Sequence, residues 1–454
     1  MRRSVLSLEL SSLAIVTLVT LAGCTGDDTN PAVPDSGSSA DAGPGTDATV
    51  GPEDAGRDAA PPSDGGEDAA PDAADAAIGP YLLLSYYYDG YSDTEYSAFD
   101  MVTASVQGSL GYAQYGVNVS SNTTPWVLEQ GNDIVLRMDP NQPWKPTSSW
   151  NVGNVPQATS FGNSDSFAVA EVGNKAYVLG YATDYIAVLD TSQTYDAGEP
   201  TKTIALVPTP DAAGNLEAIA IAYDASQNRL WVVLGNANSP AYPPLCAPEY
   251  HPFVVAIDTT TDAVVSGLQY TLQGYGTPTA TNAVVFDKAN DRLLIATEGC
   301  NDPVDAGDGS VSTGAFDEAY IEQISLGAGP DAGADTILLT LSPSNSPAAL
   351  VYVDSTHAFV QTGNGPTNAW DPTQSTLGAV ISNAPDTFVW DGHGHLLGPQ
   401  STLLADDAGV SIAVVAVDPL DGGVTTLATN PFTPVPANPF QQQVWQSVDI
   451  WPHP

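Results

Sequence analysis

Short β-rich runs of apolar residues, separated by turns, follow one another along residues 78–454. The unit of run, turn and run occurs seven times, while apolar residues at helical spacing are almost absent. A unit repeated along a chain in this way is typical of repeat folds. The pattern therefore predicts an all-β repeat architecture.

Each unit contains a run that we predict to be the second strand of a β-sheet. These seven strands are expected at Tyr81–Asp89, Pro125–Gln130, Lys175–Tyr181, Arg229–Leu234, Arg292–Thr297, His357–Thr362 and His395–Thr402. Gly, Pro and Asp are concentrated between the units, where turn-forming residues favour loops.

Two pairs of segments show that the units are related. Tyr223–Leu230 matches Phe286–Leu293, with an aromatic residue and Asp before the turn and Arg-Leu after it, and Tyr185–Thr191 matches Phe253–Thr259, each an apolar strand closed by Asp-Thr. Together with the strand Ala176–Leu179, these segments resemble the YVTN-type β-propeller repeat. The resemblance implies a seven-bladed propeller in which four-stranded sheets surround a central channel.

The C-terminal segment is predicted to close the ring. Val444–Trp451 alternates apolar and polar residues as a strand does, and no partner strand follows it. The first blade begins directly at Tyr81 and lacks an innermost strand. We therefore expect the last segment to supply that strand, because closure protects the sheet edges.

The N-terminus has the order of a secretion signal. Arg2 and Arg3 precede an apolar run that is too short to span a bilayer, and small residues follow it. The ending Leu21-Ala22-Gly23-Cys24 resembles the lipobox of bacterial lipoproteins, which implies lipidation of Cys24. Thr25 follows in place of an inner-membrane retention aspartate, so the outer membrane is the expected destination. An ordinary cleaved signal and an uncleaved signal anchor are the alternatives.

The residues after the cysteine form a compositionally distinct segment. From Thr25 to Ala77 there are eleven Asp and two Glu against the single Arg57, with almost no large apolar side chains. Such a segment buries too little surface to offset chain entropy, which predicts a disordered tether. The expected domains are thus a signal at 1–23, a tether at 24–77 and a propeller at 78–454.

The chain carries a formal net charge of −43. Nucleic acid is excluded as a partner, because its phosphates need Lys and Arg, and electrostatic adhesion to anionic lipid is disfavoured for the same reason. Cations, basic proteins and neutral glycans remain. The basic residues of the predicted propeller are Arg137, Lys145, Lys175, Lys202, Arg229, Lys288 and Arg292.

Cys246 and Cys300 form an even pair in an exported chain, once Cys24 is set aside as lipidated. They follow the second strands of neighbouring predicted blades, where loops share one face of a propeller. A Cys246–Cys300 disulfide is therefore predicted, with two free thiols as the alternative.

Two segments have residue types that bind metals. Asp302, Asp305 and Asp308 crowd one predicted loop and offer oxygen ligands for calcium, although their spacing is not that of an EF-hand. Asp391-Gly-His393-Gly-His395 places two imidazoles at a spacing that can chelate a transition metal. Solvent-exposed Asp-Ala-Gly sequence and a Gly-rich turn with incidental histidines are the alternatives.

The resemblance to propellers also raises the possibility of catalysis, since some are lactonases or calcium-dependent hydrolases with ligands at the channel. Oxygen-bearing side chains stand near the starts of predicted innermost strands at Asp165, Glu217, Asn282 and Asn345. Asn and Asp are also common turn formers there. No Gly-x-Ser-x-Gly elbow or local catalytic signature occurs.

We therefore favour a non-catalytic binding or scaffold protein that is monomeric and recognises a protein or glycan. A channel-metal-dependent, lactonase-like hydrolase is the alternative. Trp144, Trp150 and Trp370 stand in Pro-, Asn- and Ser-rich segments, where exposed rings would serve as binding platforms. Trp126, Trp231, Trp390 and Trp445 are instead expected to pack between blades.

Overall fold

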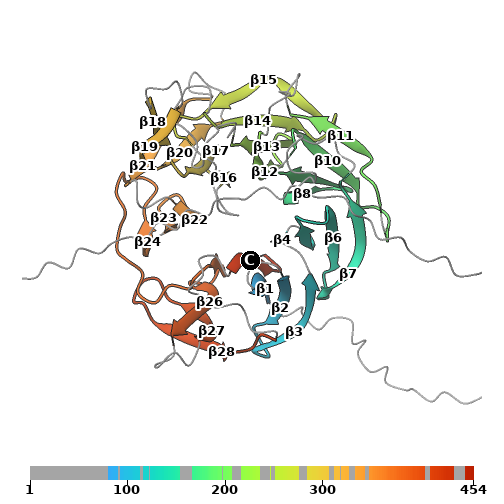
Figure 1. The fold of residues 1–454 in the computed structure, drawn as a ribbon, viewed down its shortest axis with the longest axis vertical. Coiled ribbons are helices and arrows are strands. Elements are labelled where there is room, and N and C mark those ends of the chain that lie inside the picture. The colour runs from blue at the N-terminus through green and yellow to red at the C-terminus, as the bar shows by residue number, and fades with distance from the viewer. Residues whose placement is uncertain are drawn as a thin grey trace, which may run out of the picture. The chain divides into compact units, whose positions relative to one another are not determined.

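The computed structural model describes residues 80–453, apart from 90–92, 113–115, 122, 154–165, 182, 197, 207–215, 236–245, 247–250, 276–283, 306–310, 317–318, 327–332, 343–346, 364, 404–409 and 434–444. The predicted signal, Cys24 and the predicted tether lie outside these residues. The described part is all-β and forms seven blades around a ring (Figure 1). Nothing in it is a helix long and apolar enough to cross a membrane.

The first four blades each contain four antiparallel strands, which follow one another from the channel outward. Blade 1 consists of β29 (Trp445–Trp451), β1 (Tyr81–Asp89), β2 (Asp93–Asp100) and β3 (Ser105–Tyr112). Blade 2 consists of β4 (Val117–Ser121), β5 (Pro125–Glu129), β6 (Ile134–Asp139) and β7 (Gln142–Asn151). Blade 3 consists of β8 (Ser166–Val172), β9 (Lys175–Gly180), β10 (Tyr185–Asp190) and β11 (Lys202–Ala205). Blade 4 consists of β12 (Ala218–Asp224), β13 (Arg229–Leu234), β14 (Phe253–Asp258) and β15 (Ala263–Thr271).

The remaining three blades complete the ring. Blade 5 consists of β16 (Val284–Asp287), β17 (Arg292–Thr297), β20 (Ala319–Ser325) and β21 (Asp335–Leu341), and the hairpin β18 (Asn301–Asp305) and β19 (Val311–Phe316) is inserted between its second and third strands. Blade 6 consists of β22 (Pro347–Asp354), β23 (His357–Thr362) and β24 (Thr367–Trp370). Blade 7 consists of β25 (Val389–Trp390), β26 (Leu396–Leu403), β27 (Val410–Val417) and β28 (Val424–Thr429).

All seven predicted second strands are confirmed, as β1, β5, β9, β13, β17, β23 and β26. The reason they could be recognised is their burial. β5 is buried at every residue, and β9, β13 and β17 are buried at every residue after the first. Because each blade is covered on both sides by its neighbours, these strands are apolar without interruption instead of alternating.

The predicted closure by the C-terminal strand is also confirmed. β29 pairs antiparallel with β1, from Tyr81 opposite Trp451 to Tyr86 opposite Trp445. The two ends of the described chain therefore share one sheet. Val448 and Ile450 of β29 belong to the apolar core between blades 1 and 7, so closure buries side chains as well as a strand edge.

Blade 6 departs from the expected four strands. Its outer edge is completed by the segment around Val380, which forms an isolated bridge with Asn368 of β24. The N–H of Ala369 donates to the carbonyl of Ala379 at 2.9 Å, and the N–H of Gly378 donates to the carbonyl of Ala369 at 2.8 Å. This segment covers the edge of the blade without forming a regular strand.

The expectation of exposed tryptophan platforms is wrong for two of the three residues. Trp150 and Trp370 are only 1% and 2% exposed. Trp150 packs beside Trp126 with ring centroids 5.6 Å apart, whereas the Nε1–H of Trp370 donates to the carbonyl of Gln374 at 2.9 Å. Trp126 and Trp231 are buried as expected. Polar neighbours in sequence did not reveal that these rings fill the space between blades.

Candidate functional site

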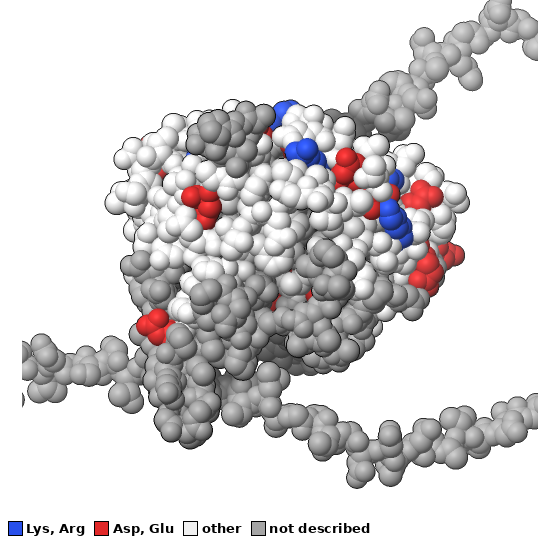
Figure 2. Space-filling view, turned by 90° about the horizontal axis from the view of Figure 1, so that it is seen from above, with Lys and Arg blue, Asp and Glu red and all other residues white. Residues whose placement is uncertain are grey.

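The ring has two different faces. On the turn face, the first strand of blades 2 to 7 turns into the second, and in the four-stranded blades the third strand turns into the fourth. On the loop face, the second strand connects to the third and the chain passes to the next blade. All seven Lys and Arg residues of the propeller lie in or close to turn-face turns. Figure 2 shows blue side chains gathered over one part of the surface.

Three of these cations are held by carboxylates of the turn face. Arg137 Nη2 lies 2.7 Å from Glu171 Oε1, Lys175 Nζ lies 2.7 Å from Asp262 Oδ1, and Arg292 Nε lies 2.8 Å from Asp287 Oδ2. All seven basic residues fall between Arg137 and Arg292, in blades 2 to 5. Blades 6, 7 and 1 contain no Lys or Arg, so these three of the seven blades have carboxylates without such compensation.

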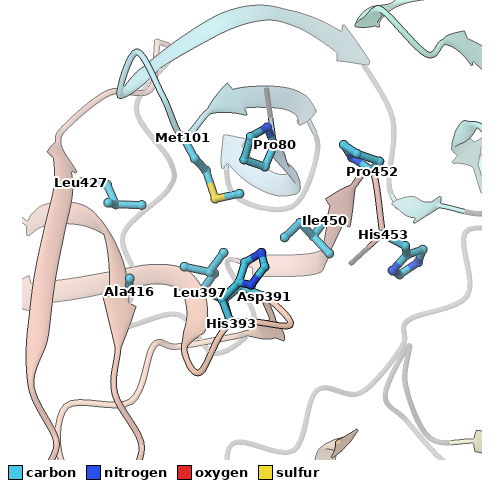
Figure 3. A pocket seen from close by; sticks show the side chains of 10 residues that line it. All are labelled: Pro80, Met101, Asp391, His393, Leu397, Ala416, Leu427, Ile450, Pro452 and His453. Atoms are coloured by element: carbon cyan, nitrogen blue, oxygen red, sulfur yellow. The ribbon is translucent and has the colours of Figure 1, made fainter. Parts of the chain in front are cut away.

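A pocket of about 430 Å³ lies on the turn face between blades 7 and 1 (Figure 3), and we call it the seam site. Its floor is apolar and comes from both blades: Met101, Leu397, Ala416, Leu427 and Ile450.

The rim of the seam site is formed by Pro80, Asp391, His393, Pro452 and His453. The volume lies within the range of about 300–1,000 Å³ that is usual for ligand pockets. Residues from both ends of the propeller sequence thus enclose one apolar pocket with polar groups at its edge.

The turn between β25 and β26 supplies the polar side of the seam site. Asp391 Oδ1 accepts the N–H groups of His393 and His395 at 2.7 and 2.9 Å, and Asp391 Oδ2 lies 2.8 Å from His395 Nδ1. Burial by itself raises the pKa of Asp391, but these hydrogen bonds lower it below its ordinary value overall. Asp391 therefore presents an anion at the rim at neutral pH.

The two-histidine segment was considered as a chelate on spacing alone. In the structure, Asp391 and His395 are engaged with each other to build the turn, while His393 is exposed at the pocket rim. Among the described residues no group of three or more His, Cys, Asp or Glu side chains is arranged to hold a metal ion.

The large exposed apolar side chains of the described part lie in blades 6, 7 and 1, which include the two blades of the seam site. The large exposed hydrophobic residues of the described part are Val102, Val380, Leu420 and Val424, with exposures of 72%, 56%, 92% and 40%. All four belong to blades 6, 7 and 1. Val102 directly follows Met101 of the pocket floor in the turn between β2 and β3.

On the loop face, Cys246 and Cys300 form a disulfide with an S–S distance of 2.06 Å. The N–H of Cys246 donates to the carbonyl of Asn301 at 2.9 Å, and the N–H of Gly299 donates to the carbonyl of Tyr275 at 2.9 Å. The ring of His251 stacks on Tyr275 at 4.0 Å. These contacts tie together the connections of blades 4 and 5.

The other predicted metal ligands do not form a described site. Asp302 is exposed and lies in β18 instead of in a loop, Asp305 ends that strand, and Asp308 is outside the described residues. Calcium binding by this segment stays a prediction.

Of the four channel candidates, Asp165, Asn282 and Asn345 lie outside the described residues. Glu217 is 8% exposed and precedes β12 with a φ of 48°. Its carbonyl accepts the N–H of Gly235 at 3.0 Å. Convergence of the four side chains on a channel cation stays a prediction.

Sequence reasoning missed the pair Glu322 and Asp335 in blade 5. Glu322 is fully buried, and its carboxyl oxygens accept the N–H of Gln273 at 2.8 Å and that of Gly274 at 2.9 Å. Asp335 Oδ2 accepts the same Gln273 N–H at 2.8 Å. Burial, followed by the charge of Asp335, raises the pKa of Glu322 to about 8. A lone acid within a strand gives no sequence signal of this arrangement.

No known family profile matches the chain, and no curated protein matches it. Solved structures similar to it include AztD from Citrobacter koseri, which is 11% identical over 82% of this chain and 97% of that chain (TM-score 0.43). BamB from Moraxella catarrhalis is 14% identical over 75% of this chain and 82% of that chain (TM-score 0.34). YCF48 from Cyanidioschyzon merolae is 12% identical over 76% and 94% (TM-score 0.36).

Proposed function

We propose that this chain is a lipid-anchored binding protein of the cell envelope and that its propeller holds a protein partner at the seam site. The observation that carries the proposal is the coincidence of an apolar pocket of about 430 Å³ with exposed apolar side chains in blades 6, 7 and 1. Soluble surfaces rarely gather exposed apolar groups without an interaction to bury them.

The chemistry of the pocket favours a protein over a glycan. Its described lining contains no Trp, Tyr or Phe ring on which a sugar could stack, whereas Leu397, Leu427 and Ile450 suit an apolar side chain. Buried apolar anchors surrounded by a polar rim supply most of the affinity in protein interfaces. The seam site has that composition.

The N-terminal organisation would place this module at a distance from the membrane. In the proposal, residues 1–23 are a signal, Cys24 is lipidated, 24–77 are an extended tether and 78–454 are the propeller, with the outer membrane as the destination. A flexible chain spans about 5–6 Å times the square root of its length. The tether therefore gives the propeller a reach on the order of tens of ångströms from its anchor.

Site-specific photo-crosslinking in cells tests the docking site. A benzoylphenylalanine at Val102, beside the pocket, is expected to capture a discrete protein partner. Thr260 is a matched control, because it is exposed in the corresponding turn of blade 4: Asp100 accepts the N–H of Val102 at 2.8 Å, and Asp258 accepts that of Thr260 at 2.8 Å. Capture from position 260 and not from position 102 would overturn the assignment.

A separate measurement tests the anchor. The variant Cys24→Ala should leave the membrane fraction and retain the thermal unfolding of the native propeller. If the variant stays with the membrane, lipidation at Cys24 is wrong, and this result leaves the docking site unaffected.

A further inference from the structure

We infer that the seam site recognises a short peptide segment in which one bulky apolar side chain stands beside lysine or arginine. This inference rests on the proposed function, since it specifies the chemistry of the protein that docks there. It has an apolar part and an electrostatic part, which the structure supports through different residues.

The apolar part follows from the pocket floor. Leu397 and Ile450 are each 4% exposed and belong to the core between blades 7 and 1, while Met101, Ala416 and Leu427 are partly buried against that core. The floor is thus rigid at its base and open toward the turn face. A volume of about 430 Å³ accommodates one large apolar side chain with adjoining backbone, and its burial would displace water from these groups.

The electrostatic part follows from the charge at the rim. Asp391 lines the rim, whereas Asp100 and Asp449 pair across the sheet with Tyr81 and Leu83 and lie with them on the blade 2 side of blade 1, away from the pocket. Arg292 is the last Lys or Arg in the chain, and the propeller has none before Arg137. No Lys or Arg of blades 6, 7 and 1 is therefore present to neutralise Asp391.

Asp391 is held in its own turn by His395, whose Nδ1 lies 2.8 Å from Asp391 Oδ2. The chain as a whole carries a formal charge of −43. Together with the carboxylate on the rim, this charge disfavours an anionic ligand and favours a segment that brings Lys or Arg to the rim.

Exposed Val102 extends the contact beyond a single side chain. It is 72% exposed and follows Met101 in the turn between β2 and β3. A peptide lying across the pocket would cover Val102 while its anchor enters the floor, and a flanking cation would lie near Asp391.

Fluorescence polarisation with defined peptides tests the inference on the full chain carrying Cys24→Ser. The probe is a labelled octapeptide of Gly and Ser with a central Arg-Leu-Arg, and the controls replace the centre by Arg-Ala-Arg or Glu-Leu-Glu. We expect the Arg-Leu-Arg peptide to bind about tenfold more tightly than either control, which corresponds to about 1.4 kcal/mol. Its affinity should fall as salt is raised from about 0.05 to about 0.5 M, because salt screens the carboxylates.

Two variants locate the binding. Ala416→Phe and Met101→Trp fill the pocket from blade 7 and from blade 1, and each is expected to weaken the Arg-Leu-Arg peptide about tenfold. Ala263→Phe is the matched control, since it adds the same ring to an exposed position of β15 in blade 4, away from the pocket. Thermal unfolding of all three variants establishes that the propeller is intact.

The outcomes are separable. Equal binding of the three peptides would overturn the inference, and so would unchanged binding by both filled variants. Peptide binding that occurs only in an Ile78→Ser variant would also overturn it, because the chain's own segment before Pro80 would then be the occupant. If none of the peptides binds while benzoylphenylalanine at position 102 still captures a protein in cells, the docking site stands and only the proposed chemistry of the partner is wrong.

Discussion

Ser85 and Ser447, 362 residues apart in the chain, join their hydroxyl groups at 2.8 Å inside blade 1. The N–H of Ser447 also donates to Ser85 Oγ at 3.1 Å, and Ser447 Oγ accepts the N–H of Val119 in blade 2 at 2.9 Å. Both serines are buried. The two ends of the propeller are thus joined by side chains as well as by the pairing of β29 with β1.

Replacing Ser447 by Ala should destabilise the closed ring. The change leaves Ser85 Oγ and the buried N–H of Val119 with fewer partners, and an unsatisfied buried polar group costs about 1–3 kcal/mol. Urea unfolding should show the loss, whereas Ser266→Ala, at an exposed position of β15, should have little effect.

Deleting residues 445–454 exposes the edge of β1 and should abolish cooperative unfolding. A deletion variant that melts like the intact chain would contradict closure by β29.

Buried Glu322, with Asp335 beside it, predicts a stability that depends on pH. The pKa of Glu322 is raised from 4.5 to about 8 in the folded protein. Its folded state therefore binds a proton that the unfolded chain releases, so the stabilisation is complete below about pH 4.5 and is lost as the pH rises through 8.

Glu322→Gln tests this directly, because the amide resembles the protonated acid. We expect the variant to match the native protein near pH 5 and to exceed its unfolding midpoint in urea above pH 8. Glu199→Gln, at an exposed position, serves as the control. A native protein whose stability is unchanged from pH 5 to 9 would show that Glu322 is already ionised.

The Cys246–Cys300 disulfide should stabilise the loop face. It closes a loop with a sequence separation of 54, for which chain entropy predicts about 4 kcal/mol. Calorimetry of the Cys246→Ser, Cys300→Ser double variant should show a lower melting temperature, and thiol titration of the unfolded native chain should find both cysteines oxidised. Free thiols at these positions would refute the pairing.

The ion pair of Arg137 and Glu171 should be strongly coupled, because Glu171 is 1% exposed in its side chain. Glu171 also accepts hydrogen bonds from Thr124 Oγ1 at 3.1 Å and Trp126 Nε1 at 3.4 Å. Arg137→Met leaves a buried carboxylate uncompensated, which costs about 3–5 kcal/mol. In a double-mutant cycle, Glu171→Gln should recover much of that loss; additive effects would mean that the pair is not coupled.

The sequence determined the repeated strands and the closing strand of this propeller. Uninterrupted apolar runs such as Arg292–Thr297 are local signals, because burial on both sides of a blade requires them. The turn residues that bound them are equally local. The Gly-rich turn at Asp391 was also recognisable, although its place in a pocket was not.

Only the tertiary structure decided where surfaces and charges meet. Trp150 is buried because Trp126 of β5 and Gly198 before β11 pack against it, and the pKa of Glu322 is raised by burial and, after that, by the charge of Asp335. The seam site joins Pro80 and His453 to blade 7 across almost the whole sequence. Such properties depend on the distance between residues in space, whereas periodicity reports only the environment of each strand.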